Sequence, residues 1–109
     1  MRFNSIDALV RDMSQGQRVI AVFKNMEHAS HAFYEACHKC DKLNMSFDAR
    51  KVNGRMRVES CDGSIRFMSE RTQIRGCSCD VFYLDRSAEL CEWMVPLISM
   101  ATQLYGVVL

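Results

Sequence analysis

The chain has 109 residues, of which 49% are apolar and 25% charged. This balance is typical of one globular domain over residues 1–109 and excludes a disordered or fibrous chain. The formal charge of +1 gives no whole-chain attraction to nucleic acid or to a membrane surface. The sequence has no apolar run of about 20 residues and no secretory leader, so we expect a cytoplasmic protein whose six cysteines are free thiols.

The first half of the chain predicts a helix, a strand and a second helix. Apolar residues recur at helical spacing over residues 5–14, with Asn4 or Ser5 as the cap. Residues 18–23 are β-branched and apolar on both faces, which is typical of a buried parallel strand. A long amphipathic helix is predicted to follow the cap Asn25. Its apolar stripe consists of Met26, Ala29, Phe33, Ala36, Cys37, Cys40 and Leu43.

The apolar period changes to two between residues 46 and 69, which indicates strands. An Asp-Gly pair in the turn Cys61-Asp-Gly-Ser predicts a hairpin within residues 55–68, made of strands 55–60 and 64–68. The polar residues 71–79 predict a loop, and the apolar residues after it predict a second buried strand that ends in an acid.

The last part of the chain predicts a helical stretch that Ser87 caps, and a final strand over residues 105–109. Pro96 lacks a backbone donor and disfavours helix at Val95, so we expect either a kink or a helix that restarts with Pro96 in its first turn. Buried strands that alternate with amphipathic helices predict an α/β fold with three layers and a mostly parallel sheet.

Four short motifs occur in a fixed order along the chain: Arg18-Val-Ile-Ala-Val-Phe-Lys-Asn-Met-Glu-His-Ala, Gly63-Ser-Ile-Arg-Phe-Met-Ser, Ile74-Arg-Gly76 and Asp80-Val-Phe-Tyr-Leu-Asp85. This order, over about residues 5 to 109, resembles the middle of a RecA-like P-loop ATPase core, as in viral terminase large subunits and some helicases. The resemblance implies that Asp85 ends the Walker B strand. It places Gly76, Asp85 and Arg86 at the edge of a vestigial nucleotide site, and it implies a phage or mobile-element origin.

The sequence departs from this family at the residues that handle ATP. The phosphate-loop pattern G-x-x-x-x-G-K-[ST] does not occur, and the chain starts where that loop would just have ended. Arg86 stands where the family has a catalytic glutamate, and a cation cannot take a proton from water.

We therefore expect a protein that is not an enzyme and needs no cofactor or metal. It would act by contact with a related ATPase, a host protein or nucleic acid. The alternative is an accessory subunit that completes the ATPase site of another chain, with Arg86 or Arg75 as an arginine finger.

The resemblance also has a consequence for the edge of the sheet. In the family, the phosphate-loop strand lies beside the strand that follows Walker B, which here is residues 105–109. Without that neighbour, a bare apolar edge is expected, and bare edges pair with other strands. We expect a homodimer or a protein partner to add a strand there. The edge residues are Tyr105, Val107, Val108 and Leu109.

Seven basic and three acidic residues lie between positions 50 and 75, which gives this stretch a charge of +4. It is either the solvated face of a sheet or a patch that contacts phosphates, for which the planar arginine side chain is suited. The candidate contacts are Arg55, Arg57, Arg66, Arg71 and Arg75.

Two cysteine pairs would together supply four thiolates to a zinc ion: Cys37, Cys40, Cys77 and Cys79. The first pair lies in the apolar helix stripe, so we favour packing over zinc. We expect the histidines of that helix to be exposed, Tyr83 and Trp93 to be core residues, and no cysteine to be a nucleophile, because no motif singles one out. The histidines are His28, His31 and His38.

Overall fold

The computed structural model describes residues 3–4, 6–52, 55–61, 63–71, 79–86, 88–100 and 103–107. The elements in chain order are β1 (Phe3–Asn4), α1 (Ile6–Ser14), β2 (Arg18–Phe23), α2 (Met26–Lys42), β3 (Asp48–Val52), β4 (Arg55–Glu59), β5 (Ser64–Ser69), β6 (Val81–Asp85), the 3₁₀ helix η1 (Glu92–Met94), α3 (Val95–Met100) and β7 (Gln103–Val107). The strands in these ranges form one sheet in the order β1-β7-β6-β2-β5-β4-β3. In this sheet order, the neighbouring strands β1, β7, β6, β2 and β5 are parallel to one another. The strands β4 and β3 follow β5, and each is antiparallel to its neighbour. This confirms the mostly parallel sheet.

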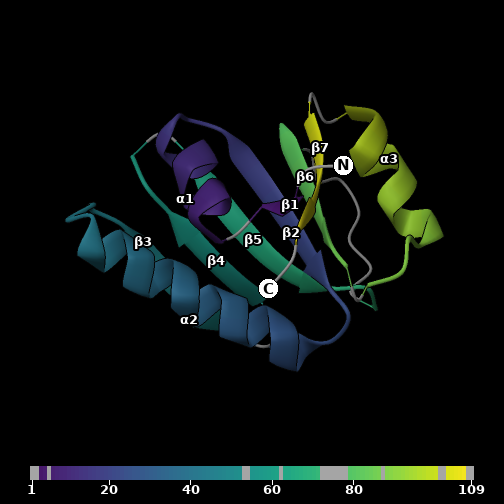
Figure 1. Ribbon diagram of the computed structural model, residues 1–109, viewed down its shortest axis with the longest axis horizontal. Coiled ribbons are helices and arrows are strands. Elements are labelled where there is room, and N and C mark those ends of the chain that lie inside the picture. Colours follow the sequence, from purple (N-terminus) through teal and green to yellow (C-terminus); the bar gives the residue numbers. More distant parts are fainter. Residues whose placement is uncertain are drawn as a thin grey trace.

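Helices cover both faces of the sheet, which confirms the three layers. On one face, α1 and α2 enclose a core that includes Leu9, Phe33 and Phe67. On the other face, Met94 and Leu97 of η1 and α3 pack against β2 and β6. Figure 1 shows the sheet between α1 and α2 on one side and α3 on the other. Because β2 and β6 lie between two layers, their residues are apolar on both sides.

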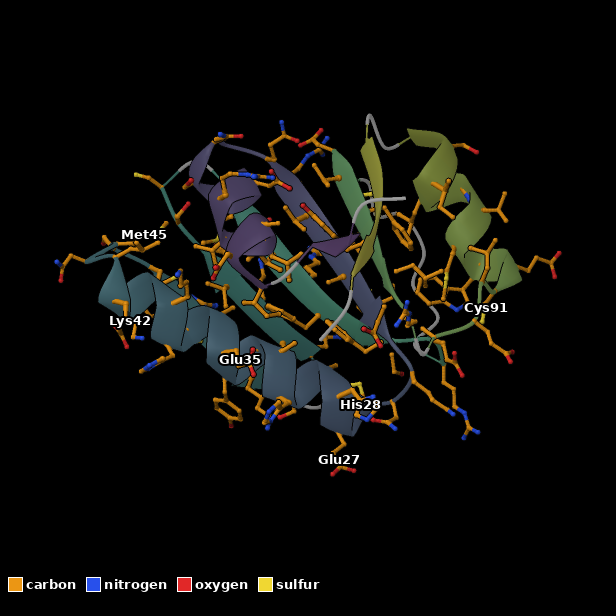
Figure 2. All side chains as sticks on the ribbon, in the orientation of Figure 1. Glu27, His28, Glu35, Lys42, Met45 and Cys91 are labelled. Atoms are coloured by element: carbon orange, nitrogen blue, oxygen red, sulfur yellow. The ribbon has the colours of Figure 1, made fainter. Side chains whose placement is uncertain are left out.

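The helix α2 begins as its sequence predicts. The Asn25 side chain accepts a hydrogen bond from the backbone N–H of His28 at 2.9 Å and so caps the helix. Glu27 and Lys42 lie at opposite ends of α2, and Glu27 points away from the sheet (Figure 2). Leu43 does not belong to the apolar stripe: it is 53% exposed, because the helix ends at Lys42 and Leu43 is its C-cap. The buried residues of α2 are Ala29, Ala32, Phe33, Ala36 and Cys40.

The predicted hairpin is present, but a third strand extends it. β4 and β5 pair antiparallel, with Met56 opposite Phe67 and Val58 opposite Ile65. No predicted strand corresponds to β3, which pairs with β4 on its other side. Residues 48–51 of β3 are exposed, so they carry no alternation of buried and exposed positions by which the strand would be recognised.

The C-terminal helix follows one of the two predicted forms. α3 begins at Val95 directly after η1, so the helix restarts with Pro96 in its first turn. Val95 itself is helical, contrary to the expectation. The helical segment begins later than predicted, because residues 88–91 are not helical. Ser87, the predicted cap, and residues 72–78 of the predicted loop lie outside the described residues.

The prediction of a bare sheet edge at β7 is wrong, because β1 pairs with this strand. Phe3 of β1 pairs with Gly106, and Asn4 pairs with Val107, so Val107 is covered by this chain's own β1. In the sheet, β1 takes the place that the resembled family gives to the phosphate-loop strand. Val108 and Leu109 lie outside the described residues.

Among the described residues, no helix combines the length and the apolar character that crossing a bilayer requires.

Candidate functional site

The carboxyl ends of the parallel strands meet at one edge of the sheet, which is the usual ligand-binding edge in such folds. Asp85 ends β6 there and is 7% exposed, and Ser69 ends β5 and is 5% exposed. Arg86 follows Asp85 directly and is exposed. The structure therefore places Asp85 and Arg86 at the expected edge, whereas Arg75 and Gly76 lie outside the described residues.

A phosphate-binding loop would have to lie between β1 and α1. β1 ends at Asn4 and α1 begins at Ile6, so a single residue, position 5, joins the two elements. A phosphate loop needs several consecutive backbone N–H groups around the phosphates and a lysine at the start of its helix. The first turn of α1 carries Asp7 instead, whose negative charge opposes a phosphate. Asp7 also forms an ion pair with Lys39 of α2, with 3.2 Å between Nζ and Oδ1.

A row of arginines crosses the other half of the sheet. Arg50 of β3 lies directly opposite Arg57 of β4, which in turn lies opposite Arg66 of β5. Residues that are opposite each other share a face, and Arg66 pairs with Ile20, which packs on the side of α3. Arg55 precedes Arg57 by two residues and therefore shares this face. We call Arg50, Arg55, Arg57 and Arg66 the arginine face.

Two arginines of the arginine face have acidic neighbours on their own strands. The Nε atom of Arg50 lies 3.1 Å from Oδ2 of Asp48, and the Nε atom of Arg57 lies 2.6 Å from Oε1 of Glu59. Arg50 and Arg55 are exposed, whereas Arg57 and Arg66 are half-buried.

The structure divides the basic residues that the sequence grouped together. Arg71 is exposed and lies beyond the end of β5, outside the paired residues of the sheet. Lys51 lies on the opposite side of β3, where its Nζ donates to Ser30 Oγ at 2.9 Å and lies 4.9 Å from the centre of the Tyr34 ring. The candidate set lacked Arg50, because its place beside Arg57 depends on β3, which the sequence analysis did not predict.

The cysteines do not form the zinc site that was considered. Cys40 is buried in the core under α2, whereas Cys79 is buried in the core under α3 and donates to the carbonyl of Leu97 at 3.7 Å. The sheet separates the two thiols, so one ion cannot bind both. Cys77 lies outside the described residues. Within the ranges that the structure describes, no three His, Cys, Asp or Glu side chains form a possible metal site.

The environment of the α2 cysteines also disfavours a reactive thiolate. Burial, with the charge of nearby groups, raises the pKa of the Cys40 thiol to about 11, and burial raises the pKa of Cys37. A thiol that stays protonated is a poor nucleophile and a poor metal ligand. Cys91 lies on the side of α3, away from His28 at the start of α2 (Figure 2).

The predicted exposure of the helix histidines and the predicted burial of Tyr83 are both observed, whereas Trp93 is only half-buried. His28, His31 and His38 are exposed on α2. Tyr83 is fully buried and donates a hydrogen bond to Asp12 of α1. Trp93 packs on the core under α3 and donates from Nε1 to the carbonyl of Glu70 at 2.8 Å.

No family model and no curated protein matches the sequence. Solved structures do match the fold. The large terminase of bacteriophage HK97 is similar with a TM-score of 0.73 and 12% identity, over 94% of this chain and 25% of that one. The large terminase ATPase domain of Thermus phage P74-26 is similar with a TM-score of 0.65 and 13% identity, over 92% of this chain and 51% of that one. The chain thus spans about a quarter of the first protein and half of the second.

These similarities confirm the resemblance that the four motifs indicated. At such low identity they concern the fold alone. The described part of the chain has the fold of the ATPase core of phage large terminases.

Proposed function

We propose that this protein works by binding a macromolecular partner and does not hydrolyse ATP. The observation that carries the proposal is the single residue between β1 and α1, which leaves no room for a loop around a triphosphate. The position of Arg86 after Asp85 supports it, because Asp85 ends the strand that the resemblance identifies as Walker B, and a guanidinium beside it would repel magnesium and accepts no proton. By its fold, the protein would be encoded by a phage or mobile element and would act in the cytoplasm of the host cell.

Nucleotide titration and phosphate release test this proposal directly. We expect no saturable heat change with magnesium and ATP up to about 1 mM, which corresponds to binding weaker than roughly 4 kcal/mol. Phosphate release should equal that of buffer, while an active P-loop ATPase measured in parallel gives a clear signal. Hydrolysis by the wild type that the Asp85→Asn variant abolishes would overturn the proposal, since it would show a working site at the end of β6.

A second function is favoured by the exposure of Arg86 at the carboxyl edge. There, its guanidinium would reach the nucleotide of another chain and complete that chain's ATPase site. The two functions differ in one measurement on a copurified partner ATPase. If Arg86→Ala leaves the complex intact but abolishes stimulation of the partner, the accessory-subunit function is correct. If stimulation is unchanged, or is lost only together with binding, the protein is a plain binding module.

Self-association is a further part of the proposal. A homodimer through the sheet would now have to form along β1 or β3, the outer strands of the described sheet. Light scattering at micromolar concentration distinguishes a monomer from a dimer.

A further inference from the structure

We propose that two copies of this chain pair along β3, in antiparallel orientation, about a two-fold axis that passes through Ala49. This inference rests on the self-association within the proposed function and gives it an interface. It is carried by the charges of β3 and β4, which complement a second copy of themselves in this register. β3 is an outer strand of the described sheet and has five residues, whereas β1, the outer strand at the other end, has two.

The charges of β3 and β4 form two rows of opposite sign. Asp48 lies directly opposite Glu59, and Arg50 lies directly opposite Arg57. Like charges that face each other on neighbouring strands destabilise a sheet, whereas opposite charges stabilise it. Each row reaches the outer side of β3 with a single sign, so a further strand with the reverse order of charges would stabilise both rows.

A second copy of β3 supplies that strand in one register. When a two-fold axis through the sheet relates two antiparallel strands, the residue on the axis lies opposite its own copy. An axis through Asp48, Arg50 or Lys51 would therefore bring like charges together. An axis through Ala49 instead sets Asp48 opposite the partner's Arg50, and Arg50 opposite the partner's Asp48. The row of arginines on one copy then continues into the row of acids on the other.

The α2 side of the sheet leaves room for the second copy. α2 packs over β4 and β5, so at a strand spacing of about 4.8 Å the two α2 helices would lie roughly 20 Å apart across the axis. A helix with its side chains is about 10–12 Å wide, so the two helices do not clash. Ala49 is exposed, and its small side chain lets the two strands approach on the axis.

An exposed aromatic ring adds apolar surface beside this edge. Tyr34 of α2 is 57% exposed and packs against Phe33, with 5.2 Å between the ring centroids. The Nζ atom of Lys51 lies 3.2 Å from the Tyr34 hydroxyl oxygen, so Tyr34 is next to β3. A tyrosine at an interface supplies both apolar area and a hydroxyl group for hydrogen bonds. The second copy would cover part of this ring.

Sedimentation velocity of the purified chain tests the inference through charge reversal. We expect the wild type to form a dimer at concentrations between about 1 and 100 µM. Asp48→Arg and Arg50→Asp each turn two attractive pairs of the dimer into two repulsive pairs, so each should raise the dissociation constant about tenfold or more. The matched controls Glu27→Arg and Lys24→Asp make the same changes of charge at exposed positions outside β3. They should stay within about twofold of the wild type.

Mixing the two reversed variants distinguishes this register from a general effect of charge. A chain with Asp48→Arg has two cations at positions 48 and 50, and a chain with Arg50→Asp has two acids there. In a mixed dimer, opposite charges therefore face each other at both positions, and we expect it to form at least as tightly as the wild-type dimer. The double variant Asp48→Arg/Arg50→Asp should form a homodimer again. Recovery in either arm also shows that the single variants are folded.

Three results would overturn the inference. The first is a wild type that stays monomeric up to about 100 µM, and the second is a dimer that neither reversal weakens, which would place the interface away from β3. The third is a loss of the dimer in both variants that neither mixing nor the double variant restores. A monomer that still copurifies with another protein would refute this interface and leave the binding function intact. The phosphate-release assay needs no dimer, so failure of the non-hydrolytic function is seen separately.

Discussion

Replacing Gly63 by alanine tests how the hairpin of β4 and β5 is held against α1. A Cβ atom at this position would overlap the carbonyl oxygen of Met13 and lie 2.8 Å from that of Gln17. Both atoms belong to the backbone, so no change of rotamer relieves the clash and the turn has to move away from α1. That movement also strains the hydrogen bond from the Ser64 N–H to the Gln17 carbonyl, which is 3.1 Å long.

The expected loss of stability is large for so small a change. Overpacking costs about 1–3 kcal/mol, and a weakened hydrogen bond adds about 1 kcal/mol. The lower chain entropy of unfolded alanine offsets about 0.4–1 kcal/mol. We therefore expect Gly63→Ala to lower the free energy of unfolding by about 2–3 kcal/mol and the melting temperature by roughly 10–20 °C.

Urea unfolding followed by circular dichroism measures this difference. Cys61→Ala is the matched control, because Cys61 is exposed in the same turn and should change stability by less than about 0.5 kcal/mol. If Gly63→Ala is as stable as the control, the close approach of this turn to α1 does not exist in solution.

Three other substitutions each remove one polar contact. Tyr83→Phe removes the donor that reaches the buried carboxylate of Asp12, so urea unfolding should show a loss of about 1–3 kcal/mol, and an unchanged midpoint would contradict this. The hydrogen bonds from Arg18 lower the pKa of Asp80. The pair therefore stabilises the fold above the unfolded pKa of about 3.9, and this contribution is lost as the pH falls through the lower folded pKa. Asp80→Asn should lower the melting temperature at pH 7 and flatten its decline at acidic pH; profiles that coincide at every pH would refute the role of the pair. Asn25→Ala removes the cap of α2 and should cost about 1 kcal/mol in thermal unfolding, and no measurable change would show that the cap is dispensable.

Local patterns in the sequence determined the elements that are recognisable on their own. The apolar strand β2, the cap and buried face of α2, and the hairpin were predicted correctly, because each depends on the spacing of neighbouring residues. The position of Asp85 at the end of a buried strand followed from the apolar run before it and was also correct. Gly63 was predicted to be a turn residue as part of an Asp-Gly pair. Its φ is not in the left-handed region, and the structure requires glycine there because Met13 leaves no room for a side chain.

Tertiary structure decided which distant residues share a surface. β1 covers part of β7 through pairs between positions about 100 residues apart, and no local period encodes such a pairing. The separation of Cys40 from Cys79 depends on which face of the sheet each helix covers.

The arginine face also depends on both the sequence and the tertiary structure. Its charges are visible in the sequence, but their alignment is set by the register of β3 and β4, and the exposed strand β3 leaves no hydrophobic pattern to reveal it. The sequence by itself determined the fold class and the absence of a phosphate-loop motif. Only the folded sheet, through hydrogen bonds between strands far apart in the chain, decided which arginines lie side by side.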